Sequence, residues 1–113
     1  MKIGFCMLLW TTSVGQEHKA LLADIKKTGY DGVEITIFSG TPDDYEQTGR
    51  MLDDLGLGRT GISVVPTLEM NPLSEDAQER KAAVEYIKWC VDCTAALGAD
   101  AIGGPLHQPL GHF

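Results

Sequence analysis

Strand and helix patterns alternate along the whole 113-residue chain. Short apolar or β-branched runs, which are typical of buried strands, are separated by longer segments whose apolar residues recur at helical spacing. Three strand–helix–strand units in succession predict a parallel sheet with right-handed crossovers. The expected strands cover residues 3–9, 33–38, 60–65 and 101–104, and the expected helices cover residues 16–28, 42–55 and 74–97.

Local signals mark several helix ends. Thr41 is suited to cap the second helix and Pro42 to occupy its first position. Gly29, Gly56 and Gly98 follow the three helical patterns, where a left-handed residue is wanted at the carboxyl end. The third helix is expected to bury a stripe of residues against the sheet: Val84, Ile87, Cys90, Val91, Thr94 and Leu97.

Glu34 is an acid inside an apolar strand. Alternation places Val33, Ile35 and Ile37 toward the helices and Glu34 with Thr36 on the opposite, interior face. A buried carboxylate is costly unless it is paired or hydrogen-bonded. Glu34 is therefore either an acid that lies under a functional site and orients the residues that contact the substrate, or a structural carboxylate held by neighbouring groups. We favour the structural interpretation.

Two α/β architectures fit the repeats. One is a small open α/β sandwich, and the other is the first four strands of a (βα)8 TIM barrel, in which each unit takes roughly 30 residues. The similar helix-to-strand turns at residues 27–32, 55–58 and 97–100 favour the barrel. Residues 1–113 are then expected to form its N-terminal half, either as a fragment or as a half-barrel that pairs edge to edge with a second copy.

Charge narrows the range of partners. Nine Lys and Arg residues against sixteen Asp and Glu residues give a net charge of −7, which disfavours binding to a phosphate backbone. We therefore expect no nucleic-acid partner. The sequence has no apolar run long enough for a membrane span and no signal-peptide pattern, so we expect no membrane association and a cytoplasmic location.

The three cysteines are expected to be free thiols. Cys90 and Cys93 form a C-x-x-C pattern, but they lie within a helical segment, and no second pair completes a zinc site. In a parallel sheet, functional groups gather at the carboxyl ends of the strands. The residues with useful chemistry there are Trp10, Glu69, His107 and His112. The two histidines are loosely spaced and lack a nearby carboxylate, so a histidine that lines a cleft is favoured over a metal ligand.

Taken in order, several segments resemble the N-terminal half of the xylose-isomerase-like barrel superfamily of sugar phosphate isomerases and epimerases. Within it, the D-tagatose/D-psicose (allulose) 3-epimerases are the most similar. The resemblance covers essentially the whole chain. The segments that carry it are residues 1–10, 29–35 (Gly-Tyr-Asp-Gly-Val-Glu-Ile), 71–76 (Asn-Pro-Leu-Ser-Glu-Asp) and 97–107, which ends in Ile-Gly-Gly-Pro-Leu-His.

The resemblance implies a metal-dependent reaction on a ketose. In such enzymes a divalent ion (Mn, Co or Mg) polarises the carbonyl, one glutamate removes the neighbouring proton to give an enediolate, and a second returns a proton to the other face. The family takes its metal ligands and both glutamates from strands five to eight. The resemblance therefore assigns no catalytic and no metal-binding residue to this chain, and the isolated chain is expected to be inactive and metal-free.

The resemblance does assign to this chain part of the surface that contacts the sugar, which we call the substrate wall. It implies sugar contacts by residues at or beyond the strand ends: Cys6, Val65, Pro105, His107 and Leu110. Cys6, Val65 and Leu110 depart from the usual residues of the epimerases. These departures leave open a hydroxypyruvate isomerase-like or inosose dehydratase-like activity on the same scaffold.

Two further alternatives stand beside the epimerase. An endonuclease IV-like member of the same superfamily is disfavoured by the acidic balance. A non-catalytic half-barrel would instead be a binding or assembly module. The expected partners are a small-molecule ketose or related sugar and either a second copy or a missing C-terminal half.

Overall fold

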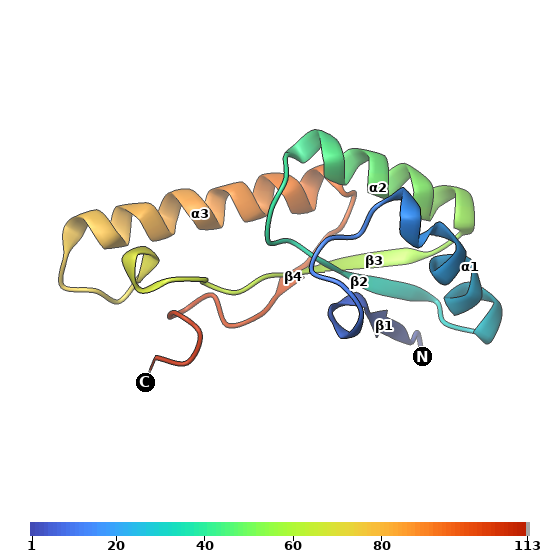
Figure 1. Cartoon of the computed structure of the whole chain (residues 1–113), viewed down its shortest axis with the longest axis horizontal. Helices are drawn as coiled ribbons and strands as arrows, with labels where there is room; N and C mark the ends of the chain where they lie inside the picture. Colours follow the sequence, from blue (N-terminus) through green and yellow to red (C-terminus); the bar gives the residue numbers. More distant parts are fainter. Residues whose placement is uncertain (113) are drawn as a thin grey trace.

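Four parallel strands form one open sheet in the order β1-β2-β3-β4, and three helices cover one of its faces (Figure 1). The computed structural model describes residues 1–112. The strands are β1 (Gly4–Cys6), β2 (Gly32–Thr36), β3 (Gly58–Ile62) and β4 (Ile102–Gly103). The helices are α1 (Lys19–Thr28), α2 (Pro42–Leu55) and α3 (Ala77–Ala96), and the 3-10 turns are η1 (Met7–Leu9), η2 (Gln16–His18) and η3 (Leu68–Met70). The predicted α/β fold with alternating parallel strands and helices is confirmed.

Helix α2 begins and ends where the sequence predicts. The Thr41 side chain accepts a hydrogen bond from the Asp44 amide at 3.4 Å, and Asp44 Oδ2 accepts one from the Thr41 amide at 2.8 Å. This reciprocal pair gives the Thr41 amide a partner and adds a side-chain acceptor for the Asp44 amide, which also donates to the Thr41 carbonyl at 3.1 Å. Gly56, with φ of 66°, closes the other end.

All four strands differ from their predicted ranges, β1 and β3 the most. The chain leaves β1 after Cys6 and turns into η1, where the amides of Trp10 and Thr11 both donate to the Met7 carbonyl. Met7 is fully buried in the core, so the apolar run continues past Cys6 although the strand does not. Strand β3 pairs over Gly58–Ile62, earlier than the predicted 60–65, and Val65 forms only an isolated parallel bridge with Pro109, outside the strands of the sheet.

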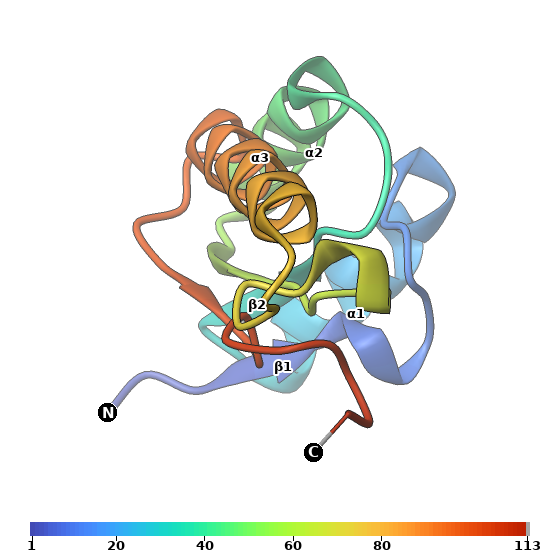
Figure 2. The ribbon, with the colours of Figure 1, turned by 90° about the vertical axis from the view of Figure 1, so that its left-hand side faces the viewer.

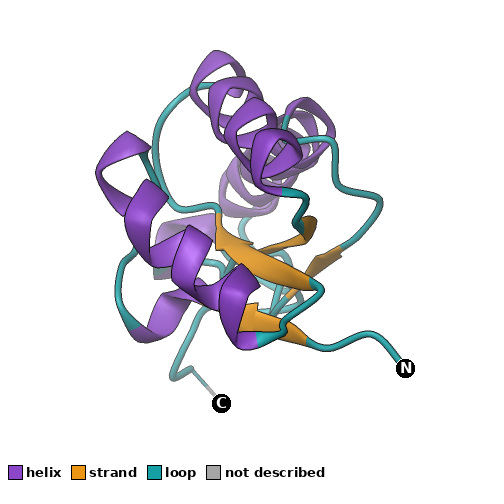
Figure 3. Ribbon diagram, turned by 90° about the vertical axis from the view of Figure 1, so that its right-hand side faces the viewer, coloured by secondary structure: helices purple, strands orange, loops and turns teal. Residues whose placement is uncertain are grey.

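The core lies between the sheet and the helices. Val33, Ile35 and Ile37 are buried on the helix side, as alternation predicts, and Ile25 and Leu52 pack with them. Figure 3 shows the helices gathered on one side of the strands. Burial of this apolar face stabilises the arrangement of strands and helices.

The predicted apolar stripe of α3 is wrong at two positions. Val84 and Val91 are 48% and 51% exposed. The helix contacts the core instead through a row that contains smaller side chains: Ala83, Cys90, Cys93, Thr94 and Leu97. Gly61 of β3 permits this approach, because a Cβ there would lie 3.2 Å from Thr94 Oγ1. The amino-terminal part of α3 extends past the strands, and the helix contacts η3 (Figure 1).

Three glycines form a row across the opposite, inner face. Gly4, Gly32 and Gly58 are direct partners in the register of β1, β2 and β3. A Cβ on Gly32 would lie 2.6 Å from the Gly58 carbonyl oxygen, closer than a real side chain tolerates. We call these three residues the glycine row. Within residues 1–112, no helix is long and apolar enough to cross a membrane.

The glycine row yields a matched pair of variants. Gly32→Ala is expected to destabilise the fold by about 1–3 kcal/mol, because backbone must shift to admit the methyl group. Gly4→Ala is the control, since its Cβ would sit 3.6 Å from the Gly32 carbonyl oxygen, an ordinary contact. Urea unfolding of the two variants measures the difference, and equal midpoints would contradict the close approach.

Candidate functional site

The segments that follow the four strands meet at one end of the sheet. Figure 2 looks toward this end, where the chain after β4 passes in front of the strands. Val65 and Pro109 form a parallel bridge, and the Leu110 amide donates to the Val65 carbonyl at 3.1 Å. These contacts tie the segment after β4 to the segment after β3, at the edge where parallel α/β folds place their functional groups.

The predicted wall residues lie in different environments at this end. Val65 is fully buried, and Leu110, bonded to it through the backbone, is 68% exposed. Pro105 is half-buried and His107 is exposed. The structure therefore brings Val65 and Leu110 together and presents His107 to solvent, while the sugar contacts of all four stay predictions.

Cys6 lies apart from these residues, on the inner face, where it pairs with Glu34 in the register of β1 and β2. Both side chains are half-buried. Burial is the main cause that raises the pKa of the Cys6 thiol, and the neighbouring Glu34 carboxylate raises it further. Cys6 is therefore a protonated thiol at neutral pH beside an acidic side chain.

The other candidates at the strand ends are dispersed. Trp10 is 53% exposed and stacks on Phe5, with 4.5 Å between ring centroids. Glu69 and His112 are exposed on separate segments. The carboxyl ends thus offer aromatic, imidazole and apolar surfaces, a composition that suits a wall around a small polar molecule.

A buried network beneath β3 escaped the sequence analysis. Ser63 Oγ donates to the Ile37 carbonyl at 2.6 Å and accepts from the Tyr86 hydroxyl at 2.9 Å, and Cys90 Sγ lies 3.5 Å from it. Gly104 lies so close that a Cβ there would overlap the Ser63 carbonyl oxygen. The network fixes the end of β3 to β2, to α3 and to the segment that carries Pro105 and His107. The sequence features that could have indicated this network are a serine within an apolar run and the spacing of Tyr86 and Cys90, which lie one helical turn apart.

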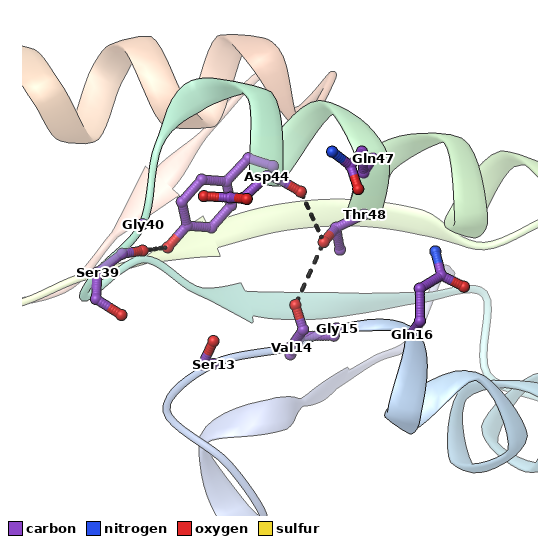
Figure 4. Close-up of a pocket in the computed structure, with 10 residues that line it drawn as sticks. Ser13, Val14, Gly15, Gln16, Ser39, Gly40, Asp44, Gln47 and Thr48 are labelled. Atoms are coloured by element: carbon purple, nitrogen blue, oxygen red, sulfur yellow. Dashed lines mark hydrogen bonds between the residues drawn. The ribbon is translucent and has the colours of Figure 1, made fainter.

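A polar cavity of about 210 Å³ lies between residues 13–16 and the first turns of α2 (Figure 4). Thr48 Oγ1 is placed to donate to the carbonyls of Val14 and Asp44, at 3.3 and 3.2 Å. The Tyr45 hydroxyl donates to the Ser39 carbonyl at 2.8 Å, and burial raises the pKa of Tyr45 to about 12, so it keeps its proton. None of the predicted wall residues lines this cavity. Its hydrogen bonds join the segment before α1 to α2.

The side chains of the described residues, 1–112, form no cluster that fits a divalent ion. Within residues 1–112, no three His, Cys, Asp or Glu side chains lie close enough together to hold a metal ion. Two-ligand contacts do not hold such an ion tightly. We therefore derive no step of a reaction through a metal bound by these residues.

Comparison with known families matches residues 22–111 to the family described as xylose isomerase-like TIM barrel. The chain belongs to this family. A comparison with curated proteins gives no match. The family explains the order of the strands, since sequential parallel strands are the arrangement of a (βα)8 barrel.

Solved structures of similar fold include sugar isomerases and epimerases. A protein of Anabaena variabilis ATCC 29413, assigned as a sugar phosphate isomerase/epimerase, is 26% identical, with a TM-score of 0.72 over 96% of this chain and 38% of its own. D-Allulose 3-epimerase from Methylomonas sp. in complex with D-allulose is 20% identical, with a TM-score of 0.83 over 100% of this chain and 39% of its own. D-Psicose 3-epimerase with D-tagatose from Clostridium cellulolyticum H10 is 23% identical, with a TM-score of 0.74 over 96% of this chain and 38% of its own. This xylose isomerase-like chain thus spans 38–39% of the length of these proteins.

The environment of Cys6 predicts how its reactivity depends on pH. Alkylation requires the thiolate, so the labelling rate rises with pH around the pKa of the thiol. A raised pKa moves the midpoint of this rise above pH 9.0, the ordinary pKa of a cysteine. Glu34→Gln removes the negative charge and is expected to lower that midpoint. Iodoacetamide labelling across pH, read by mass spectrometry, measures both. A midpoint below 9.0 in the unmodified chain would contradict the described environment.

Proposed function

We propose that this chain supplies the first four strands, with the three helices between them, of a metal-dependent sugar isomerase or epimerase of the ketose 3-epimerase type. The observation that carries the proposal is the likeness to the 26% identical sugar phosphate isomerase/epimerase, whose match covers 96% of this chain and 38% of that protein. Family membership over residues 22–111 supports the same scaffold. The whole protein would act on a small ketose through an enediolate.

The role proposed for this chain is to form part of the substrate wall. When a divalent ion is bound by the whole protein, it makes the proton beside the sugar carbonyl more acidic. We assign the metal ligands and the catalytic acids to the remainder of the barrel. The chain's own groups bind and orient the sugar and exclude water from it.

His107 is the strongest candidate for a polar sugar contact. It is an exposed imidazole in the segment after β4, and this segment is held by the Val65–Pro109 bridge and by the packing of Gly104 against Ser63. An imidazole can donate to or accept from a sugar hydroxyl. Pro105 and Leu110 would contribute apolar contact beside it, and Cys6 would contact the sugar from the inner face. Val65 is buried, so it would shape the wall through the backbone bond that holds Leu110.

A chimeric barrel tests the proposed function. This chain would replace the matched 39% of the Methylomonas D-allulose 3-epimerase, and conversion of D-allulose to D-fructose would be followed by chromatography. We expect manganese-dependent turnover. His107→Ala is expected to raise KM about fivefold with little change in kcat, because a hydrogen bond to a hydroxyl contributes about 1 kcal/mol.

His112→Ala is the matched control, since His112 is also an exposed histidine of the same segment. It is expected to leave KM unchanged. A folded chimera that binds manganese but has no turnover would count against the epimerase role and favour a non-catalytic module. Equal effects of the two histidine variants would count against the assignment of His107 alone.

Metal titration tests whether the metal ligands belong to the remainder of the barrel and not to this chain. Calorimetric titration of the 113-residue chain with manganese or cobalt is expected to show no stoichiometric site, because its ligand types are dispersed. A micromolar one-to-one site that disappears in His107→Ala would contradict this expectation and would place a metal ligand in this chain.

A further inference from the structure

The segment after β4 forms an arch whose two ends are fixed to the same short stretch of chain. We call residues 104–110 the arch (Figure 2). Just before its beginning, the Ser63 amide donates to the Gly103 carbonyl at 3.1 Å. At its end, the Leu110 amide donates to the Val65 carbonyl, also at 3.1 Å. Since Ser63 and Val65 are only two residues apart, the position of this stretch sets the position of the whole arch.

The arch itself has little internal freedom. Pro105 and Pro109 have fixed φ angles, and the Leu106 amide donates to the Gly104 carbonyl at 2.9 Å. His107 lies in the middle of the arch and is exposed. The imidazole is therefore carried by a short stiff segment, and its placement depends on how the two ends of that segment are held.

The beginning of the arch packs directly on Ser63, which is fully buried. Gly104 has a φ of 119°, which favours glycine, and a Cβ there would overlap the Ser63 carbonyl oxygen. The Ser63 amide is bonded to Gly103 and its carbonyl lies against Gly104, so both backbone groups of Ser63 contact this part of the chain. A shift of Ser63 is therefore transmitted to the arch by backbone contact.

The Ser63 hydroxyl uses its full hydrogen-bonding capacity, which is one donor and two acceptor positions. It donates to the Ile37 carbonyl at 2.6 Å, so the Tyr86 hydroxyl, 2.9 Å away, must donate in the bond between the two hydroxyls. The Cys90 thiol donates as well, at 3.5 Å. Burial raises the pKa of both Tyr86 and Cys90, and this keeps their protons available for these bonds.

Tyr86 is the partner that ties Ser63 to the outer layer of the fold. It is a half-buried residue of α3, and its ring lies against Trp89, with 5.5 Å between the ring centroids. The packed ring fixes where the hydroxyl meets Ser63. A buried hydroxyl that loses one of its partners is less firmly held, because the remaining bonds can be satisfied in more than one position.

We propose that Tyr86 is a positioning residue for the substrate wall, and that its hydroxyl acts through Ser63 to hold the arch and thereby to place the His107 imidazole. Tyr86 itself contacts no sugar in this account. The consequence for a sugar rests on the proposed function, whereas the effect on the arch does not. A hydrogen bond with a purely structural role would stabilise the sheet as a whole and would not act on the arch in particular.

Amide hydrogen exchange of the 113-residue chain, followed by NMR, tests the positioning of the arch. The reporters are the amides of Ser63 and Leu110, and the reference is the Gly58 amide, which donates to the Asp31 carbonyl at 3.0 Å at the other end of β3. Tyr86→Phe removes the hydroxyl and keeps the ring. We expect it to raise the ratio of reporter rate to reference rate about fivefold, the effect of losing one hydrogen bond.

Two further variants serve as controls. Tyr45→Phe removes another buried tyrosine hydroxyl, which donates to the Ser39 carbonyl at 2.8 Å, and it should leave the ratio unchanged. Ser63→Ala should raise the ratio at least as much as Tyr86→Phe does. Adding Tyr86→Phe to Ser63→Ala should then cause no further rise, because the hydroxyl through which Tyr86 acts is already absent.

The chimera with the Methylomonas epimerase tests the consequence for the sugar. Tyr86→Phe is expected to raise KM about threefold with little change in kcat, and to have no further effect on KM in the His107→Ala background, because a positioning residue acts through the group that it places. An inactive chimera would count against the proposed function alone, since the exchange ratios are measured without turnover.

Three results would overturn the positioning role. The first is an unchanged exchange ratio in Tyr86→Phe, because the hydrogen bond would then stabilise the whole fold or nothing. The second is an equal rise of the ratio in Tyr45→Phe, which would mean that the arch responds to any loss of stability. The third is a KM effect of Tyr86→Phe that persists in full in His107→Ala, which would mean that Tyr86 does not act through His107.

Discussion

The structure depends on the burial of one face of a parallel sheet. Val33, Ile35 and Ile37 lie on the helix side of the central strand region, and the helices pack on them. Right-handed crossovers between strands in sequential order place all three helices on this one side, so the burial holds all four strands in their order. On the opposite face Thr36 is fully buried, but Glu34 and Cys6 are only half-buried and the glycine row carries no side chains, so this face is covered less completely.

Two regions of the sheet carry polar side chains, namely the carboxyl ends of the strands and the inner face. At the carboxyl ends, Ser63, Tyr86 and Cys90 lock β3 to α3 and so hold the segment with His107 in place. A wall held by buried hydrogen bonds can orient a ligand without a large entropic cost. On the inner face, Glu34 of β2 and Cys6 of β1 provide charge and polarity beside the glycine row. The proposed role of this chain in the substrate wall follows from the first of these regions.

The sequence predicts the parts of the fold that depend on local pattern. The limits of α2 follow from Thr41, Pro42 and Gly56, and the alternation in β2 places Val33 and Ile35 correctly. Contacts between distant segments are harder to predict. Nothing local reveals that Met7 enters the core from a 3-10 turn, or that a glycine at 61 lets α3 approach through its smaller side chains and leaves Val84 and Val91 exposed.

The candidate site shows the same division. The pattern of strands predicts that residues 105–110 lie at the carboxyl edge, but not that Val65 is buried while Leu110 is exposed. The partnership of Cys6 with Glu34 depends on register, which is set by the whole sheet. Burial and pairing of single side chains are therefore known only once the segments are assembled.

Hydrogen exchange of the backbone amides tests the central claim most directly, namely that the chain forms an open sheet with β1 and β4 at its edges. We predict slow exchange in β2 and β3, which are paired on both sides, and fast exchange at the outward-facing amides of β1 and β4. Equal protection across all four strands in the dilute chain would contradict the open sheet.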